Sequence, residues 1–147
     1  MKNKITEVRV NSCGWLVKVL SLRMDKDMET ELGDHGLNVK HFATLMTLLE
    51  QDNLTQTEIA QRVRNPQYVT SRLLDKLEER QLIERRPDPN SRRSHRVVLT
   101  DNGRSMKQIL PAIVKRVNKK NLSPLDTDER TELIRLLKKL LGFDFSS

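Results

Sequence analysis

Residues 55–100 read TQTEIAQRVRNPQYVTSRLLDKLEERQLIERRPDPNSRRSHRVVLT, and this stretch decides the fold. It opens with a capping box, in which the Thr55 hydroxyl accepts a backbone N–H and the Glu58 carboxylate accepts the N–H of the cap. Ile59, Ala60 and Val63 follow at the spacing of one helix face. The pattern predicts a short helix that begins just after Thr55.

A second helix is predicted directly after the first. Asn65 and Pro66 are typical of an N-cap and a first helical position, because proline there gives up no helical hydrogen bond. An apolar face then recurs at helical spacing, opposite a polar and partly cationic face. Two short helices joined by a tight turn indicate a helix-turn-helix. The inner residues are Val69, Leu73, Leu74 and Leu77, and the outer residues are Gln67, Tyr68, Ser71, Arg72, Asp75 and Lys76.

The segments 83–86 and 95–99 have strand composition and flank the turn PDPNSRRS, which predicts an arginine-bearing hairpin, or wing. With this wing the chain resembles the MarR family of winged helix-turn-helix regulators. The resemblance rests on LTQTEIAQRV, RLLDKLEERQLIERR and DPNSRRSHRVVLTDNG, and a weaker similarity covers nearly the whole chain. The sequence departs from the family pattern at Ser91, where the family usually has an aspartate two residues before the wing-tip arginine, here Arg93.

The resemblance implies a mainly α fold with a small β-hairpin wing (α+β), in which the N- and C-terminal helices form a dimerisation region. We expect one domain over residues 1–147, with a DNA-binding region at 54–100 and dimerisation helices at 1–36 and 104–147. The implied function is sequence-specific transcriptional regulation. We expect a repressor that binds a palindromic operator as a homodimer and is released by a small aromatic or phenolic ligand.

The flanking sequence favours a dimer independently. Helices are predicted over 5–32, 38–51 and 126–141, with another that begins at 100 or 101 and kinks at Pro111. Asp126 and Glu129 make a second capping box, at the start of the last helix. A winged helix closes its core with about three helices and a hairpin, so the leucine-rich faces outside it need another partner. They can pack within one chain or interleave with a second copy. We expect the second copy, because a symmetric dimer presents two helices about one turn of duplex apart.

Candidate DNA contacts lie on the second helix of the motif and on the wing. Side chains in the exposed first half of that helix can reach base edges in the major groove, whereas Thr55 and Lys76 are better placed for phosphates. Wing-tip arginines suit a narrow minor groove. The alternative for each residue is an ordinary solvated surface position. The full set is Thr55, Gln67, Tyr68, Ser71, Arg72, Lys76, Arg85, Arg86, Arg92 and Arg93.

An effector pocket is implied by the resemblance alone, between the dimerisation helices and the winged region, where the family often takes small aromatic acids. Packing between helices is the alternative role for each candidate. The candidate wall residues are Trp15, Arg23, His41, Phe42 and Met46.

Cys13 raises the alternative of a redox-responsive regulator, since some similar repressors sense peroxide through a first-helix cysteine. Cysteine is among the most buried residue types, so we expect a core or interface position instead. His35 and His41 lack the spacing of a metal site, and we take them for a loop and a helix-surface histidine. We expect no metal and no cofactor.

The composition has 27 Lys and Arg against 20 Asp and Glu, a net charge of +7, which favours an anionic partner. One cysteine, no apolar run near ~18 residues and no signal sequence predict a cytoplasmic protein. The absence of a nucleophile, paired-acid or phosphate-loop motif predicts that it is not an enzyme. A sequence-tolerant architectural DNA-binding protein and an interaction protein that uses its leucine-rich ends remain alternatives.

Overall fold

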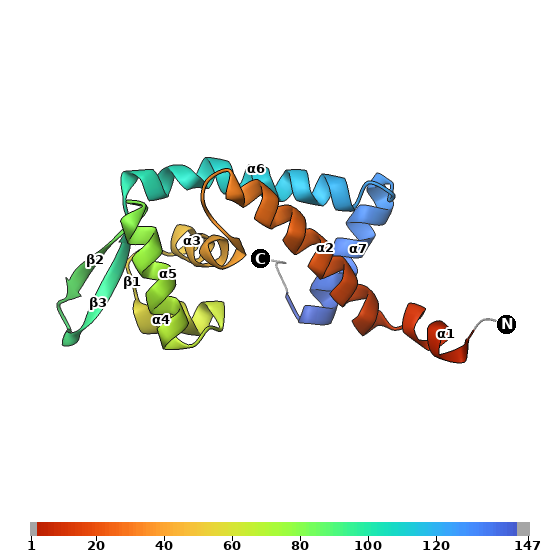
Figure 1. Cartoon of the computed structure of the whole chain (residues 1–147), viewed down its shortest axis with the longest axis horizontal. Coiled ribbons are helices and arrows are strands. Elements are labelled where there is room, and N and C mark those ends of the chain that lie inside the picture. Colours follow the sequence, from red (N-terminus) through yellow and green to blue (C-terminus); the bar gives the residue numbers. More distant parts are fainter. Residues whose placement is uncertain (1–2, 144–147) are drawn as a thin grey trace.

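A computed structural model describes residues 3–143 as seven helices and a small antiparallel sheet (Figure 1). The predicted mainly α fold with a hairpin wing is confirmed. Within residues 3–143 no helix is both long and apolar enough to cross a membrane. The elements are α1 (Lys4–Val10), α2 (Cys13–Gly33), α3 (Val39–Glu50), β1 (Leu54–Thr55), α4 (Gln56–Val63), α5 (Gln67–Glu79), β2 (Ile83–Asp88), β3 (Ser91–Leu99), α6 (Asp101–Asn121) and α7 (Thr127–Leu141).

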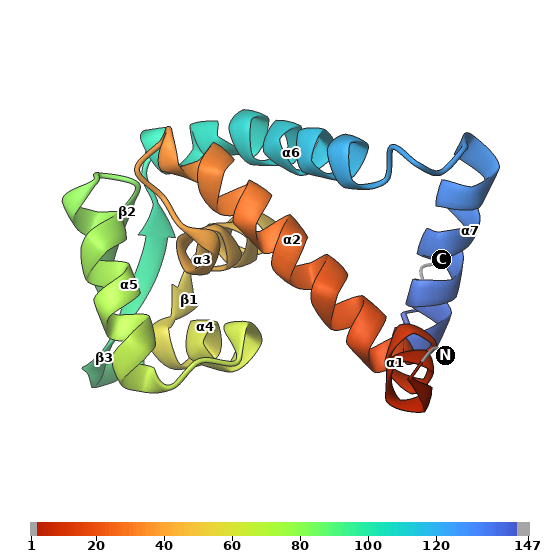
Figure 2. The same ribbon diagram turned by 45° about the vertical axis from the view of Figure 1, so that its right-hand side comes forward.

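The sheet and helices α3, α4 and α5 form a compact group at one end of the molecule (Figure 1). Helices α2 and α6 lead away from this group, and α1 projects beyond the far end of α2. In the turned view α2, α6 and α7 outline an open triangle (Figure 2). Within residues 3–143, α3 packs against α2 and α6, and α6 also packs against β3; these contacts join the winged region to the terminal helices.

One continuous core joins the winged region to α6. Apolar side chains from α3, α4 and α5 pack together, and those of α6 extend the same cluster toward α2. The predicted inner residues of α5 are buried except Val69, which is half-buried. Side chains with essentially no exposure include Leu32, Leu45, Leu48, Ile59, Leu74, Leu77, Leu110 and Ile113.

Several predicted helix caps are confirmed. Thr55 and Glu58 form a capping box on α4, and Asp126 and Glu129 form another on α7. The prediction of Asn65 as the N-cap of α5 is wrong, because Pro66 takes that position and makes no side-chain hydrogen bond there. The turn between the two helices instead depends on Arg64, which ends α4 in the left-handed region at φ 54°.

The predicted single helix over residues 5–32 is two helices. Asn11 and Ser12 separate α1 from α2, and the Ser12 hydroxyl accepts the backbone N–H of Trp15 at 3.3 Å. The Asn11 side-chain amide donates to the Glu7 carbonyl at 2.8 Å. Short polar side chains that bond the nearby backbone compete with helical continuity, so the apolar spacing alone misjudged this segment.

The wing is longer than the sequence indicated. Strands β2 and β3 pair antiparallel from Ile83↔Leu99 to Pro87↔His95, and an irregularity between Pro87 and Asp88 precedes the turn. The unpredicted strand β1 adds to the other side of β3, giving the order β1-β3-β2. Because β1 runs into the cap of α4, the wing is attached to the helix-turn-helix through main-chain pairing.

The start of α6 is packed against the base of the wing. Thr100 caps the helix, accepts the Gly103 N–H at 3.0 Å and donates to the Gln81 carbonyl at 2.6 Å. A Cβ at Gly103 would lie only 2.0 Å from the Leu82 carbonyl oxygen. Glycine at this position therefore sets the distance between α6 and the strand that opens the wing.

Replacing Gly103 tests this close approach. We expect Gly103→Ala to lower the free energy of unfolding by ~1–3 kcal/mol, since a backbone carbonyl cannot swing aside as a side chain can. Gly33→Ala is the control, because a Cβ at Gly33 meets nothing within 4 Å. It should be neutral or stabilising by ~0.5–1 kcal/mol. Urea denaturation measures both variants, and an equal response would contradict the packing argument.

Candidate nucleic-acid interface

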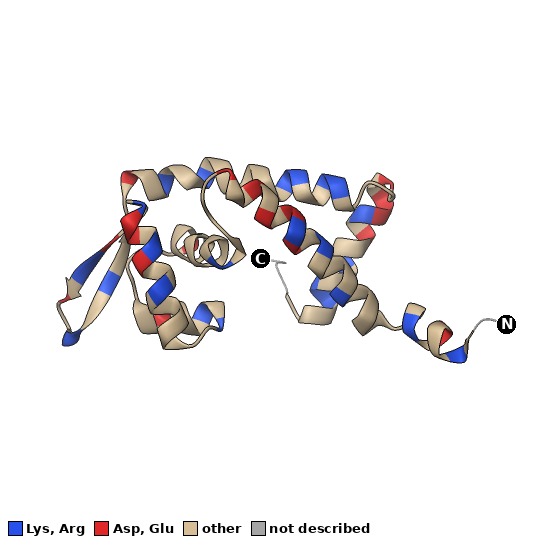
Figure 3. Cartoon of the chain, in the orientation of Figure 1, with Lys and Arg blue, Asp and Glu red and all other residues tan. Residues whose placement is uncertain are grey.

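The first half of α5 presents polar side chains to solvent on the side that also carries the wing. Gln67, Tyr68 and Arg72 are exposed, and Ser71 is half-buried. The opposite face is fixed by Thr70 and by the leucines of the core, so the orientation of the helix is set by burial. Figure 3 shows that Lys and Arg also lie along the wing strands and at the wing tip.

Gln67 has a partner that the sequence did not reveal. Its side-chain amide nitrogen donates to the Thr57 hydroxyl of α4 at 3.1 Å. This bond leaves the Gln67 carbonyl oxygen and one N–H available, which is the donor–acceptor pair that glutamine offers to an adenine edge. Thr57 is therefore a positioning residue for a predicted base contact. Only the folded turn brings the two residues, ten positions apart, together.

Arg85 ties the wing to α5. Its guanidinium lies 2.7 Å from the Asp75 carboxylate and 2.7 Å from that of Glu78, and it donates to the Ser71 carbonyl at 3.1 Å. With these three acceptors the Arg85 side chain is largely covered, whereas its neighbour Arg86 is exposed and pairs with Glu84. Arg85 thus holds β2 against the helix in the free protein.

The wing tip is organised by Asp88, which was not among the candidate site residues. Its carboxylate accepts the Asn90 N–H at 3.0 Å and the Ser94 hydroxyl at 2.8 Å, and it pairs with Arg96. The Asn90 N–H, the Ser94 hydroxyl and Arg96 lower the pKa of the Asp88 carboxyl below its ordinary value. The Asp-Pro-Asn-Ser order is the available signal, because aspartate favours such turns.

Arg92 and Arg93 extend from this turn and are exposed. The backbone N–H of Arg93 donates to the Ser91 hydroxyl at 3.3 Å, so Ser91 supports the main chain of the tip. Within residues 3–143 the guanidinium groups of Arg72, Arg92 and Arg93 make no hydrogen bond or ion pair. They remain available to an anionic partner.

The two predicted phosphate contacts are engaged within the chain. The Thr55 hydroxyl accepts the Glu58 N–H at 3.2 Å as part of the cap. Lys76 pairs with Glu79 at 3.1 Å on the exposed surface of α5. Exposed pairs of this kind are worth only ~0–1 kcal/mol, so Lys76 can exchange its partner for a phosphate at little cost.

The predicted effector-pocket residues do not gather in one place. Only Phe42 lines the apolar cavity between α2, α3, α6 and α7, while Arg23 borders a separate polar hollow and Met46 packs against the core. Trp15 is 38% exposed and lies outside that cavity. His41 is only 8% exposed, which makes the prediction of a helix-surface histidine wrong.

His41 belongs to the cap of α3. Its Nδ1 accepts the Asn38 N–H at 3.2 Å, while the Asn38 side chain accepts the His41 N–H at 2.9 Å. Burial, followed by the nearby Arg80, lowers the pKa of the imidazole. The ring is neutral when it accepts this bond, so its evident role is structural.

Cys13 is the first residue of α2 and is exposed, so a place in the core of the chain is wrong. An interface position stays a prediction. No group of three or more His, Cys, Asp or Glu residues suited to a metal occurs within residues 3–143. His35 lies on the exposed turn after α2.

The sequence is similar to those of known transcriptional regulators. A model of the MarR family matches residues 35–94. The chain is 33% identical to the uncharacterized HTH-type transcriptional regulator YkoM of Bacillus subtilis, over 72% of this chain and 69% of that protein. It is 24% identical to the HTH-type transcriptional repressor NicR of Pseudomonas putida, over 89% and 83%. It is 31% identical to the transcriptional repressor MprA of Escherichia coli but spans only 62% of that protein.

Solved structures show the same fold. The reduced form of MarR from Escherichia coli superposes with a TM-score of 0.83 at 24% identity, over 88% of this chain and 96% of that one. A mutant MarR complexed with operator DNA gives 0.77 at 24% identity, over 91% and 96%. A MarR family protein of Mycobacterium tuberculosis solved with salicylic acid gives 0.72 at 25% identity, over 88% and 96%.

The ionised Asp88 carboxylate should stabilise the wing tip, because its pKa is lowered in the folded protein. A folded-state pKa below the ordinary value means that the carboxylate stabilises the wing above that ordinary value, and that this stabilisation is lost as pH falls through the lowered pKa. Asp88→Asn should therefore loosen the wing tip already at neutral pH. We expect faster hydrogen exchange at the Asn90 amide, corrected for intrinsic rates. Glu84→Gln, which removes an exposed carboxylate from the same wing, should leave this exchange unchanged; equal acceleration in both would refute the role of Asp88.

Proposed function

Because the chain belongs to the MarR family of winged helix-turn-helix regulators, we propose that it is a transcriptional repressor that binds a palindromic operator as a homodimer and is released by a small aromatic ligand. Two of its relatives, NicR and MprA, are repressors, which supports repression over activation. We propose no catalytic activity for it. We also propose that it acts in the cytoplasm, where its operator DNA would be accessible.

One observation carries the proposal: the exposed face of α5, which would be the recognition helix, lies on the same side of the molecule as wing arginines that have no acidic partner in the described part of the chain. Arg72 lies on α5, and Arg92 and Arg93 lie at the wing tip, without ion-pair partners within residues 3–143. Arg72 suits a guanine edge in the major groove. The wing arginines suit the negative potential of an adjacent narrow minor groove. Thr55, Lys76 and Arg86 would contact the backbone and fix the register.

Division of the chain into regions follows from the same proposal. We assign DNA binding to residues 54–100 and dimerisation to residues 1–36 and 104–147. Helices α1 and α7 have no buried residue in the single chain. Their exposed side chains include Ile5, Val8, Ile134, Leu136, Leu140 and Leu141, a surface that a second copy would cover.

A sequence-tolerant architectural role is the second candidate, favoured by the arginines of the wing, which carry no base specificity by themselves. Selection of bound sequences from a random duplex library separates the two. A repressor of the proposed kind enriches a palindrome with half-sites about one helical turn apart. An architectural protein binds without enriching a sequence.

Replacing Arg72 and replacing Arg93 should affect binding to the selected operator in different ways. Arg72→Ala should cost ~1–3 kcal/mol of binding free energy and relax specificity at one position in each half-site. Arg93→Ala should weaken binding across sequences and flatten the salt dependence, because a wing contact acts mainly through charge. Lys107→Ala, on the exposed surface of α6, is the charge control. Equal losses from both arginine variants, independent of sequence, would refute this division.

A charge placed on α7 tests the dimer. Leu140 is 74% exposed in the single chain, so Leu140→Glu should fold normally but bury a carboxylate in the proposed interface. We expect the dimer dissociation constant to rise by about a hundredfold or more, measured by sedimentation equilibrium. Gln61→Glu adds the same charge to the exposed surface of α4, outside the proposed dimerisation segments, and should not change it. A folded wild-type monomer at micromolar concentration would contradict the dimer itself.

A further inference from the structure

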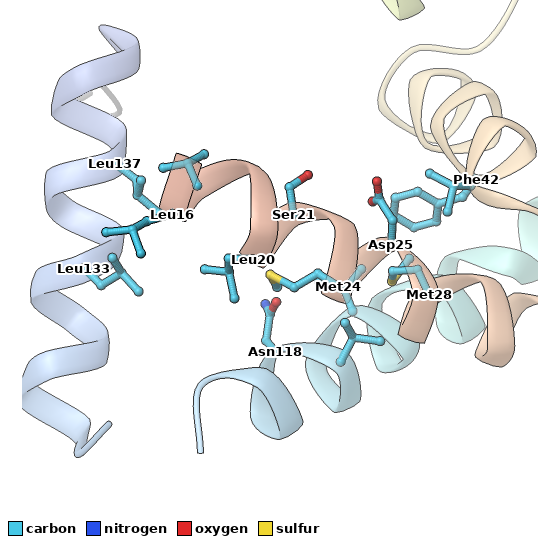
Figure 4. Close-up of a pocket in the computed structure, with 14 residues that line it drawn as sticks. Leu16, Leu20, Ser21, Met24, Asp25, Met28, Phe42, Asn118, Leu133 and Leu137 are labelled. Atoms are coloured by element: carbon cyan, nitrogen blue, oxygen red, sulfur yellow. The ribbon is translucent and has the colours of Figure 1, made fainter. Parts of the chain in front are cut away.

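An apolar cavity of about 600 Å³ lies between α2, α3, α6 and α7 (Figure 4). Small-molecule sites commonly have volumes of roughly 300–1,000 Å³ and mostly apolar walls. Of its fourteen lining residues, eleven are Leu, Val, Met or Phe. Leu133 and Leu137 of α7 face Leu16 across one end, and Phe42 of α3 closes the other. The size and lining suit a small hydrophobic molecule.

Three polar residues border this cavity, and only one of them is charged. They are Ser21, Asp25 and Asn118, and the lining contains no Lys, Arg or His. The Asp25 carboxylate and the Phe42 ring both border the cavity, and the Asn118 amide is directed toward Met24 and Leu20 (Figure 4). Within the described part of the chain, neither the Asp25 carboxylate nor the Asn118 side chain makes an ion pair or hydrogen bond. The cavity therefore offers one acidic side chain, two neutral side chains that can both donate and accept hydrogen bonds, and no basic group.

We infer that the cavity binds a hydrophobic amine: an apolar, preferably aromatic body with a cationic head that pairs with Asp25. This inference rests on the proposed ligand-responsive function and names the chemical class of the ligand. The ammonium group would meet the Asp25 carboxylate and the face of the Phe42 ring, which attracts cations. Met24 and Met28 line the middle of the cavity, and their flexible thioethers adapt to varied ring shapes.

The same geometry disfavours an aromatic acid in this cavity. A carboxylate enters an apolar site only when a cation or several N–H donors replace its water. The lining has no cation, its donors are limited to the Asn118 amide and the Ser21 hydroxyl, and the Asp25 charge would repel the ligand. Arg23 and His41, the candidates that could neutralise an acid, lie outside the cavity. Selectivity for charge, more than for shape, is the property that distinguishes this site.

Three probes with one ring system test the inference on the full-length protein. They are 2-naphthylmethylamine, 2-naphthylmethanol and 2-naphthoate, which at neutral pH are cationic, neutral and anionic. Calorimetric titration should rank their affinities amine, alcohol, acid, with about tenfold or more between amine and acid. Asp25→Asn should remove the advantage of the amine over the alcohol. Asp34→Asn removes a carboxylate from the end of the same helix, outside the cavity, and should preserve the ranking.

A cavity-filling variant locates the binding. Leu20 borders the cavity and is half-buried, so Leu20→Phe should weaken all three probes at least about tenfold while the thermal transition is retained. The inference is overturned by a preference for naphthoate, by an Asp25→Asn variant that keeps the amine preference, or by binding that survives Leu20→Phe. It is also overturned if no probe binds a protein that binds its selected operator; in that case the DNA-binding function stands. A failure to enrich any operator would instead count against the proposed function, whichever probe binds.

Discussion

The first turn of α6 lies in direct contact with the backbone of Leu82, and the attachment of the wing depends on this contact. The absence of a side chain at Gly103 permits the approach, and Thr100 bonds both Gly103 and the Gln81 carbonyl. The other strand is held as well, because Asp52 accepts the Leu99 N–H at 2.9 Å and Arg104 donates to the Leu99 carbonyl at 2.7 Å. Both ends of the hairpin are thus fixed to α6 and to the loop before α4. The wing has little freedom to move apart from that helix.

Local signals in the sequence predicted the local structure well. The capping boxes at Thr55 and Asp126 were readable because each cap and its partner are three residues apart. The break at Ser12 was missed because apolar spacing continues across it, and a cap competes with that spacing only through geometry. Long-range features left no such signal. The Arg85 contacts with α5 join separate elements, and the cavity is built by helices from both ends of the chain, so neither has a spacing to read.

Net charge says less about function than the way charges are paired. Two cations of α6 are paired with carboxylates of α2: Lys120 lies 2.6 Å from Asp27, and Arg116 lies 2.7 Å from Glu31. These pairs lower the pKa of both carboxyls, with the hydrogen bond from the basic partner as the first cause. Arg72 of α5 and the wing-tip residues Arg92 and Arg93 have no such partners within residues 3–143, and their side chains are exposed to solvent. An excess of positive charge attracts any polyanion, whereas unpaired arginines at defined positions on a rigid frame can also select among sequences.

Helix α6 extends from the cavity to the base of the wing, and this connection is the route by which the proposed ligand would act on DNA binding. Val114, Val117 and Asn118 line the cavity, and Gly103 of the same helix packs on Leu82. Because that contact leaves no room for a side chain, a displacement of α6 would be expected to move the base of the wing with it. If α6 has two positions, one that binds DNA and one that does not, a ligand shifts the equilibrium between them only by as much as its affinity for the two differs. Linkage makes the effect mutual: operator DNA must weaken ligand binding by the same factor by which the ligand weakens operator binding. A ligand that binds the cavity tightly but equally well in both positions would occupy the protein and leave the operator bound.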